Sequence, residues 1–278
     1  MPDRQRLDAA LVERGLAGGR EKAKELIAAG LVTVNGQTAT KASRAVAPED
    51  ALACTGTLHR YVGRGGEKLE KALAAADLSP RGCCCLDIGA STGGFTDCLL
   101  QGGAAKVYAL DVGHGQLHET LCADSRVINL EGTDVRRVDE ILARMGRDRP
   151  SVITIDVSFI SLEKIWPAVT ALAAPGAVVV SLIKPQFEAG RSALGKKGVV
   201  KDPAVHREVL NRLIGVWREA GWMPTHFDYS PITGGDGNIE YLAVLRRRSD
   251  MAAAWQGDVR RLVELARQAL AIKGGHGG

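Results

Sequence analysis

The 278-residue sequence lacks a hydrophobic run that could cross a membrane. Its longest apolar stretch, residues 168–183, is interrupted by Pro175-Gly176 and is shorter than the ~20 residues of a membrane-spanning helix. The first residues, MPDRQRLDAALVERG, are charged and lack the apolar centre of a signal peptide. We therefore expect a cytoplasmic protein without membrane contact.

The sequence is also poor in features that would demand a particular partner or an oxidising compartment. Six cysteines include the run Cys83-Cys84-Cys85. Neighbouring residues of a strand point to opposite faces, so this run cannot pair with itself and fits a reducing compartment. A net charge of +4 permits an anionic partner without requiring one. The length and a hydrophobic content of 45% suffice for one α/β domain and a smaller unit.

What the sequence does contain is a glycine-rich stretch at residues 83–95, CCCLDIGASTGGF. A short apolar strand ending at Ile88 runs into a turn with Gly89, Gly93 and Gly94, and a helix follows. Such a turn brings backbone N–H groups to the mouth of a parallel sheet, where a nucleotide-like ligand can approach closely. The spacing is not the dinucleotide pattern G-x-G-x-x-G. It resembles the first motif of class I S-adenosylmethionine-dependent methyltransferases; a tight turn of another α/β protein is the alternative.

Further apolar runs predict strands that end at polar residues. The expected strands lie within residues 105–113, 125–136, 151–159, 176–184 and 238–246. Strands that alternate with helices predict an α/β fold with a doubly wound, mostly parallel sheet of the Rossmann-like kind. In such a fold, ligands bind beyond the carboxyl ends of the strands.

Four aspartates fall at predicted strand–loop junctions on the same edge of this sheet. An acidic residue after the second strand accepts hydrogen bonds from a ribose diol, which is the role expected of Asp111. Asp134 is placed to accept from an adenine amino group, and acidic surroundings suit a sulfonium cation. A single aspartate at a strand end can also be a helix cap or a turn residue. The expected cofactor-binding residues are Asp87, Gly89, Ala90, Ser91, Gly93, Gly94, Phe95, Asp111 and Asp134.

The N-terminal segment carries a separate pattern of helix, basic helix and hairpin. One helix ends at Gly15, a second covers residues 20–29, and Asn35-Gly36 joins two short β runs. Residues 6–43 resemble the S-four-type RNA-binding module, with Gly19 in place of the usual serine before the second helix. This resemblance implies phosphate and shape contacts with structured RNA, although a solvated helix face is the alternative. The expected RNA-binding residues are Arg4, Arg6, Arg20, Lys24, Lys41, Arg44, Arg64 and, in a glycine-rich loop, Lys196 and Lys197.

Lys184 ends an apolar run and emerges at the edge of the predicted sheet. Burial lowers the pKa of a lysine and can make it a base, whereas nearby carboxylates raise it. With Lys68, Asp156 and Glu240 it forms a set that resembles the FtsJ-type ribose 2′-O-methyltransferases. The whole chain is similar to the TlyA family of bacterial ribosomal RNA 2′-O-methyltransferases, some of which are named haemolysins. The matching motifs are RYVGRGGEKL, DIGASTGGFTD, DVGHGQL, DVSFISL, IKPQFE and GNIEYL.

The resemblance implies methyl transfer from S-adenosylmethionine to a ribose 2′-hydroxyl, that of a cytidine, in ribosomal RNA within a ribosomal subunit. Our hypothesis is that Lys184, aligned by Asp156 and Glu240, polarises or deprotonates this hydroxyl. Lys68 would hold the ribose or its phosphate. Residues 156–159 lack the N-P-P-[YF] pattern of enzymes that methylate base amino groups. The alternatives are a non-catalytic RNA-binding or ribosome-assembly protein and, with little support in the sequence, a haemolysin.

We expect an RNA-binding domain at residues 1–60, a methyltransferase domain at 61–250, and a C-terminal helix with a flexible tail at 251–278. Apolar residues at helical spacing place that helix between Asp250 and Ile272. His114, His118 and Cys122 are spaced by four and would share a helical face, but no fourth ligand is suggested, so no metal site is expected. The protein is expected to be a monomer.

Overall fold

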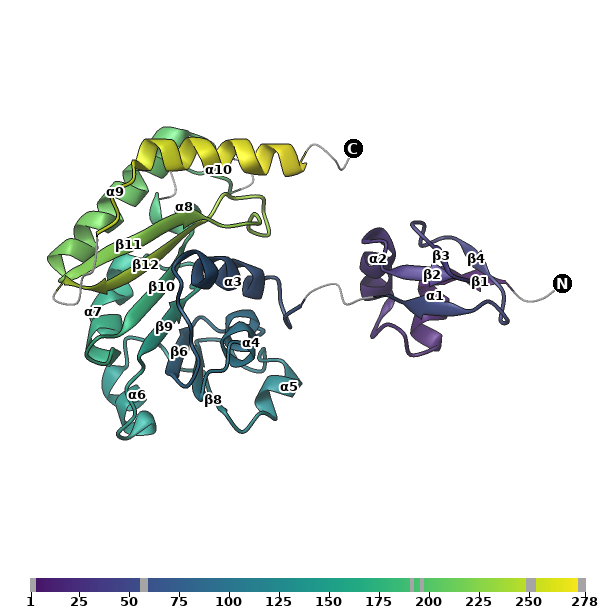
Figure 1. Ribbon diagram of the computed structural model, residues 1–278, viewed down its shortest axis with the longest axis horizontal. Helices are drawn as coiled ribbons and strands as arrows, with labels where there is room; N and C mark the ends of the chain where they lie inside the picture. Colours follow the sequence, from purple (N-terminus) through teal and green to yellow (C-terminus); the bar gives the residue numbers. More distant parts are fainter. Residues whose placement is uncertain (1–3, 56–59, 191–192, 196–197, 249–253, 275–278) are drawn as a thin grey trace. The chain divides into compact units, whose positions relative to one another are not determined.

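A computed structural model of the chain describes residues 4–55, 60–190, 193–195, 198–248 and 254–274, the side chains of 271–274 excepted (Figure 1). The chain divides into two compact units, Met1–Arg60 and Tyr61–Gly278. Each unit has its own hydrophobic core. In the described part of the chain, no helix combines the length and the apolar character that crossing a bilayer requires.

The first unit contains the two helices and the hairpin that the sequence predicts. The helices are α1 (Leu7–Glu13) and α2 (Arg20–Ala28), and the hairpin joins β2 (Val32–Val34) to β3 (Gln37–Thr38). Asn35 and Gly36 both have positive φ, as this tight turn requires. Three short strands were not predicted: β1 (Gln5–Arg6), β4 (Ala45–Val46) and β5 (Leu52–Cys54). β5 pairs with β2, and β1 pairs with β4.

The second unit is built on a seven-stranded sheet with the order β11-β12-β10-β9-β6-β7-β8. Its strands are β6 (Cys84–Ile88), β7 (Lys106–Asp111), β8 (Val127–Glu131), β9 (Val152–Ile155), β10 (Val178–Ile183), β11 (Trp222–Tyr229) and β12 (Tyr241–Arg247). β12 runs antiparallel to both of its neighbours, and the other described pairings are parallel. The predicted α/β fold with a mostly parallel, Rossmann-like sheet is confirmed.

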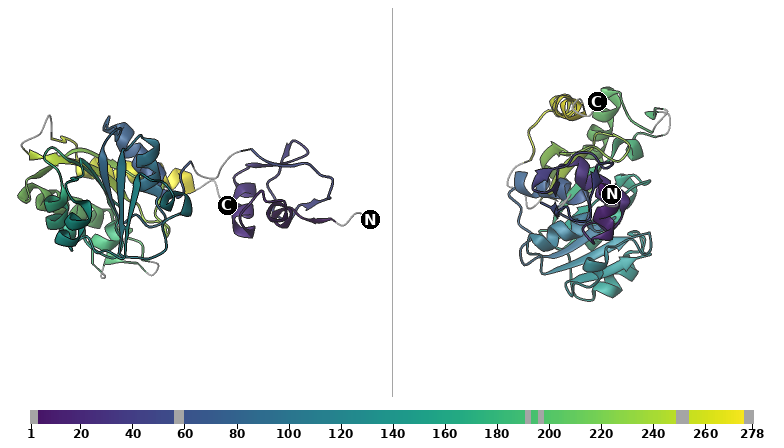
Figure 2. Two further views of the ribbon diagram at one scale, coloured as in Figure 1. Left: turned by 90° about the horizontal axis from the view of Figure 1, so that it is seen from below. Right: turned by 90° about the vertical axis from the view of Figure 1, so that its right-hand side faces the viewer.

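Helices cover both faces of this sheet (Figure 2). They are α3 (Gly65–Ala75), α4 (Gly94–Gln101), α5 (Glu119–Cys122), α6 (Val138–Met145), α7 (Leu162–Leu172), α8 (Pro185–Glu188), α9 (Pro203–Glu219) and α10 (Val259–Gly274). Helices α3, α4 and α5 contribute to one core, and α6, α7, α9 and α10 contribute to the other. Alternate residues of each central strand face opposite cores, since side chains along a strand alternate in direction.

Helix α10 begins later than the sequence predicts. The expected start at Asp250 is wrong for the described residues, because 254–258 are not helical and the helix starts at Val259. The carboxylate of Asp258 accepts a hydrogen bond from the N–H of Arg260 at 2.8 Å, which caps the helix at this point. Trp255 precedes the helix and packs its ring 5.3 Å from that of Phe227.

Candidate active site

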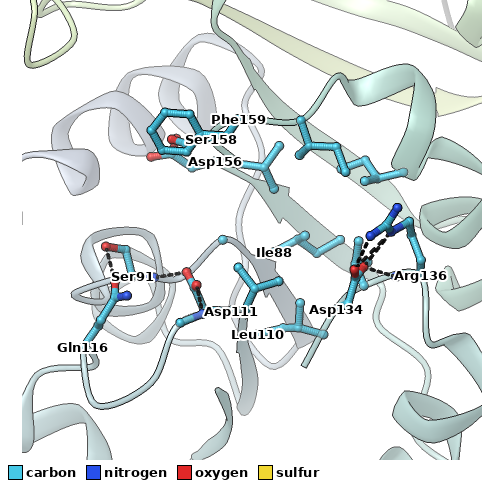
Figure 3. Close-up of a pocket in the computed structure, with 17 residues that line it drawn as sticks. Ile88, Ser91, Leu110, Asp111, Gln116, Asp134, Arg136, Asp156, Ser158 and Phe159 are labelled. Carbon is cyan, nitrogen blue, oxygen red and sulfur yellow. Dashed lines mark hydrogen bonds and ion pairs between the residues drawn. The ribbon is translucent and has the colours of Figure 1, made fainter. Parts of the chain in front are cut away.

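A pocket of about 500 Å³ lies beyond the carboxyl ends of β6, β7 and β9 (Figure 3). Apolar side chains line part of it, among them Ile88 and Leu110. Three carboxylates, those of Asp111, Asp134 and Asp156, line it as well. In Figure 3, Asp156 lies across the pocket from Asp111. A concave, partly apolar site with a few polar groups is typical of small-molecule binding.

The glycine turn after β6 is shaped by contact with the end of β9. Gly89 has a φ of +86°, and a Cβ atom on it would lie 2.4 Å from the carbonyl oxygen of Asp156. Gly93 has a φ of +98°, and a Cβ there would meet Leu121 at 2.1 Å. A larger residue at Gly89 would push the backbone of Asp156 away, whereas at Gly93 it would displace the Leu121 side chain and be strained by the positive φ. The turn therefore needs glycine at these positions to pack against its neighbours, and Gly89 also forms part of the pocket wall.

Asp87 lies beneath the pocket rather than in its lining. Its side chain is fully buried and accepts hydrogen bonds from the hydroxyls of Thr96 at 2.7 Å and Thr154 at 2.8 Å. Burial raises the pKa of Asp87 to about 7, and the nearby charge of Asp156 acts in the same direction. Asp87 was expected to bind the cofactor, but it lines neither this pocket nor the smaller one that adjoins it. Its carboxylate links helix α4 and strand β9 to strand β6.

Asp111 and Asp134 do line the pocket, and each is already held in place. The carboxylate of Asp111 accepts from the backbone N–H groups of Ser91 at 2.8 Å and Gly113 at 2.7 Å. Asp134 accepts hydrogen bonds from the backbone N–H of Arg136 at 2.9 Å, from its Nε at 3.0 and 3.1 Å and from its Nη2 at 2.5 Å, and this pairing lowers the pKa of Asp134. Asp111 accepts one hydrogen bond on each oxygen and can accept more from a ligand. Arg136 already supplies four hydrogen bonds to Asp134, so a ligand bond to Asp134 requires the Arg136 side chain to move.

A second, smaller pocket of about 180 Å³ adjoins the first. Both pockets are lined by Gly89, Ser91, Asp156 and Ser158. The smaller one is also lined by the basic residues Arg64 and Lys184. Of the nine expected cofactor-binding residues, all except Asp87 and Gly93 line one of these two pockets.

The structure brings the four predicted catalytic residues together as two ion pairs. Lys184 Nζ lies 2.6 Å from Asp156 Oδ1 and donates to the Ser158 hydroxyl at 3.0 Å. Lys68 Nζ, on α3, lies 2.6 Å from Glu240 Oε2, just before β12. The Lys68 and Glu240 side chains are only 10% and 2% exposed. This pairing differs from the hypothesis, in which Glu240 aligned Lys184.

The two pairs influence one another electrostatically. Burial raises the pKa of Glu240, and Asp156 adds to that rise, while Lys68 and Lys184 oppose it. Asp156 and Lys184 line the smaller pocket, whereas Lys68 and Glu240 line neither pocket. The Lys184–Asp156 pair is therefore open to ligands, and the Lys68–Glu240 pair lies behind it.

Sequence reasoning missed the role of Phe159, which lines the mouth of the larger pocket. Its side chain is 90% exposed, its φ is +64°, and its ring lies 4.8 Å from that of Phe187. A bulky residue at positive φ is strained and often marks a functional segment. One hint was present in the sequence: Phe159 is an aromatic residue in the loop directly after a strand, where ligands bind in this kind of fold.

Two of the expected RNA-binding residues of the first unit, Arg6 and Arg20, lie around the buried carboxylate of Asp8. Arg6 donates two hydrogen bonds to Asp8, at 3.0 and 3.1 Å, and Arg20 donates one at 3.1 Å. The Arg6 hydrogen bonds in particular lower the pKa of Asp8 to about 2. Lys24 pairs with Glu21. Arg4 and Lys41 are exposed, Arg44 is half-buried, and Lys196 and Lys197 lie outside the described residues.

The histidines weighed as metal ligands do not share a helical face, so that expectation is wrong. Helix α5 begins only at Glu119, and His118 is its N-cap, where Nδ1 accepts from the N–H of Thr120 at 3.3 Å. His114 lies in the preceding loop, against Gly132. Within the described residues, no group of His, Cys, Asp or Glu side chains could hold a metal ion.

Comparison with known proteins identifies both units. The family described as FtsJ-like methyltransferase matches residues 61–247, and the S4 domain family matches residues 5–52. The second unit is thus an FtsJ-like methyltransferase domain. The 16S/23S rRNA (cytidine-2′-O)-methyltransferase TlyA of Mycobacterium tuberculosis is 42% identical over 258 residues, which cover 92% of this chain and 95% of that protein. The chain belongs to the TlyA family of FtsJ-like methyltransferases.

Two further relatives carry haemolysin names. Hemolysin A of Brachyspira hyodysenteriae is 43% identical over 238 residues, which cover 86% of this chain and 98% of that protein. A solved structure from Streptococcus thermophilus, with a provisional hemolysin name, superposes with a TM-score of 0.76 at 39% identity. The match covers 99% of this chain and 100% of that one. The family and the two kinds of domain predicted from the sequence are confirmed.

Proposed function

We propose that this protein transfers a methyl group from S-adenosylmethionine to a ribose 2′-hydroxyl of ribosomal RNA, with cytidine as the target nucleoside. The observation that carries the proposal is the Lys184–Asp156 ion pair at the wall shared by an acidic pocket and a basic one. Membership of the FtsJ-like family supports the reaction type. The names of its TlyA relatives support ribosomal RNA and cytidine as targets.

The residues of the larger pocket fit S-adenosylmethionine. Its carboxylates suit a cofactor that carries a sulfonium charge and a hydroxyl-rich ribose. Asp111 would bind the diol, and Asp134 would bind the adenine amino group after Arg136 moves away from it. Ile88 and Leu110 offer apolar surface to a purine ring. When bound, the cofactor supplies an electrophilic methyl group. A Cβ at Gly89 would crowd the shared wall of the two pockets.

Lys184 is the residue best placed to act on the ribose hydroxyl. A hydroxyl is a poor nucleophile, so the site must orient it and stabilise the negative charge that develops on its oxygen. Asp156 and Ser158 fix the Lys184 ammonium at 2.6 and 3.0 Å, which lowers the cost of ordering it during reaction. Asp156 is the adjacent carboxylate that can accept the proton as the hydroxyl becomes more acidic.

Lys68 and Glu240 form a buried ion pair near Lys184 and Asp156, away from the walls of both pockets. Because they line neither pocket, we replace the role first suggested for Lys68, direct contact with the ribose or its phosphate. Their paired charges sit close enough to influence the second pair, as the effects of Asp156 and Lys184 on Glu240 indicate. The Lys68–Glu240 pair would fill the space next to Lys184 and Asp156 with opposite charges that cancel.

The first unit supplies a surface for RNA. Arg6 and Arg20 converge on Asp8, which orders their guanidinium groups without neutralising both of them. Preordered arginines suit phosphate contacts that position a nucleic acid. We infer that the substrate is presented within a ribosomal subunit, and that the protein acts as a monomer in the cytoplasm.

The test is methyl transfer by purified protein, with mapping of 2′-O-methylation on ribosomal RNA. Wild-type protein is expected to methylate a ribose, and Lys184→Ala to lose transfer by about 100-fold or more while it still binds RNA. Lys164→Ala, which removes an exposed lysine of α7, is the matched control and should keep wild-type activity. Full activity of Lys184→Ala would refute the catalytic assignment. Absence of transfer by wild-type protein on ribosomal subunits would favour a non-catalytic RNA-binding role.

A further inference from the structure

Glu188, the last residue of the I-K-P-Q-F-E stretch, has a buried carboxylate that joins three helices. Its side chain is 2% exposed. Oε1 accepts from the N–H of Leu162 at 2.8 Å, and Oε2 accepts from the hydroxyl of Ser161 at 2.8 Å. Arg212, on α9, donates to Oε2 at 3.2 Å and to the Glu188 carbonyl oxygen at 2.9 Å. One side chain of α8 is therefore bound to the start of α7 and to α9.

This arrangement meets the conditions under which a buried carboxylate is stable. A buried charge is costly unless it is paired and its lone pairs are satisfied. Here a guanidinium, a hydroxyl and a backbone N–H supply those partners. The N–H of Leu162 belongs to the first turn of α7, where the helix dipole also favours a negative charge. The bonds made by Glu188 are therefore specific in geometry as well as in charge.

The segments that Glu188 connects are the two that carry the reactive ion pair. Asp156 opens the segment that ends at Ser161 and Leu162, where α7 begins. Lys184 opens the segment that ends at Glu188. Asp156 is fixed at the other end of its segment, because its N–H donates to the carbonyl oxygen of Ile88 at 2.9 Å.

Between these fixed ends lies Phe159 in its strained conformation, with a φ of +64°. Such a residue stays in place only when its surroundings determine its conformation. Phe187, one residue before Glu188, packs against the Phe159 ring at 4.8 Å. Loss of the Glu188 bonds would release the far end of the strained segment and let Asp156 move relative to Lys184.

We propose that Glu188 is a positioning residue that sets the geometry of the Lys184–Asp156 pair by binding the two segments that carry it. This inference rests on the proposed function, since it concerns the same site. Glu188 acts through Asp156 and Lys184 and does not line either of the pockets described.

The experiment compares three variants of the full chain in single-turnover methylation, well below the unfolding temperature of each. Glu188→Ala is expected to lower the rate at saturating substrates by about tenfold or more. The affinity for S-adenosylmethionine, measured by calorimetry, should change by no more than about threefold, because Asp111 and Asp134 are unaffected. Glu188→Gln keeps an acceptor for Leu162 and should retain more of the rate than the alanine variant.

Glu163→Ala is the matched control. Glu163 also pairs with Arg212, at 2.8 Å, but its side chain is 54% exposed. Among the hydrogen bonds of the described residues, its carboxylate has none to Ser161 or Leu162. Its rate should stay within about twofold of wild type, as expected for a surface ion pair. An equal loss in both alanine variants would assign the effect to Arg212 and overturn the proposal.

A double-mutant cycle with Asp156→Asn separates positioning from general stability. If Glu188 acts through Asp156, Glu188→Ala adds little to the loss caused by Asp156→Asn, so the two losses in rate are strongly non-additive. Additive losses, or a lowered unfolding temperature at an unchanged rate, would overturn the inference. Should the alanine variant not fold, the same cycle is run with Glu188→Gln. A wild-type protein that methylates no ribose would instead refute the proposed function, which the wild-type reaction alone decides.

Discussion

Removal of Lys68 should destabilise the second unit in a pH-dependent way. At the 2.6 Å separation of Lys68 and Glu240, and with an effective dielectric constant of ~20, their Coulomb attraction is about 6 kcal/mol before desolvation is subtracted. Loss of one partner of a buried pair costs about 3–5 kcal/mol, because the other charge is left buried and unpaired. Lys68→Met should therefore lower the free energy of unfolding by about that amount at pH 8.

The pH dependence follows from the raised pKa of Glu240. Burial already raises this pKa above its ordinary value, and Lys68 opposes the rise, so the variant should raise it further. A group whose pKa is higher in the folded state stabilises the fold fully below its unfolded pKa, and this contribution is lost as the pH rises through the folded pKa. The deficit of Lys68→Met should thus be small in mild acid and grow toward pH 8. The double variant Lys68→Met/Glu240→Leu should recover much of the loss.

Urea unfolding followed by tryptophan fluorescence is the assay. All four tryptophans, at 166, 217, 222 and 255, belong to the second unit, so the signal reports on that unit. Lys71→Met is the control on the same helix. Lys71 pairs with Asp228 at 2.9 Å and donates to the carbonyl oxygen of Tyr229 at 2.6 Å, but it is 27% exposed, so its loss should cost about 1–2 kcal/mol, less than that of Lys68. A Lys68→Met deficit that does not change with pH, or one that the double variant fails to reduce, would refute this reasoning.

Three further outcomes are expected. Asp87→Asn should flatten the loss of stability between about pH 4 and pH 7 in the same urea assay, because the pKa of Asp87 is raised from 3.8 to about 7 in the folded protein and the stabilisation by its proton is lost as the pH rises through this range. Asp111→Ala should weaken S-adenosylmethionine binding in calorimetry by about tenfold, since a carboxylate hydrogen bond is lost, while Asp139→Ala on the exposed face of α6 should not. Asp8→Asn should weaken binding of ribosomal RNA fragments in a filter assay, because Arg6 and Arg20 lose their common partner, and should leave cofactor affinity unchanged.

Much of the sheet could be predicted because each central strand is an apolar run that ends at a polar residue. Strand β11 was missed for a physical reason. Its sequence, WMPTHFDY, contains Pro224, which normally argues against a strand. The proline is tolerated at the edge of the sheet, where the register shifts between Pro224 and His226. Local pattern alone cannot show that a strand will lie at an edge.

The candidate site was predictable in its residue types but not in its pairings. The resemblance to known enzymes pointed to Lys68, Asp156, Lys184 and Glu240, and the structure brings them together. Which lysine meets which carboxylate depends on the packing of α3 against β12, a contact between segments far apart in sequence. Asp87 shows the same limit at shorter range: strand alternation turns its side chain toward Thr96 on α4, while the neighbouring Ile88 lines the pocket.

The two pockets that meet at the Lys184–Asp156 pair differ in the sign of the charge that lines them. The larger pocket has three carboxylates and the Arg136 guanidinium in its wall, so negative charge is in excess there. The smaller pocket has Arg64 and Lys184 beside Asp156, so positive charge is in excess there. Asp156 lines both pockets, so it can pair with Lys184 on one side while it faces the larger pocket on the other. Under the proposed function, the cationic methyl donor and the anionic RNA would therefore be attracted to neighbouring pockets. The methyl group would pass between them at the wall formed by Asp156, Ser158 and the glycine turn.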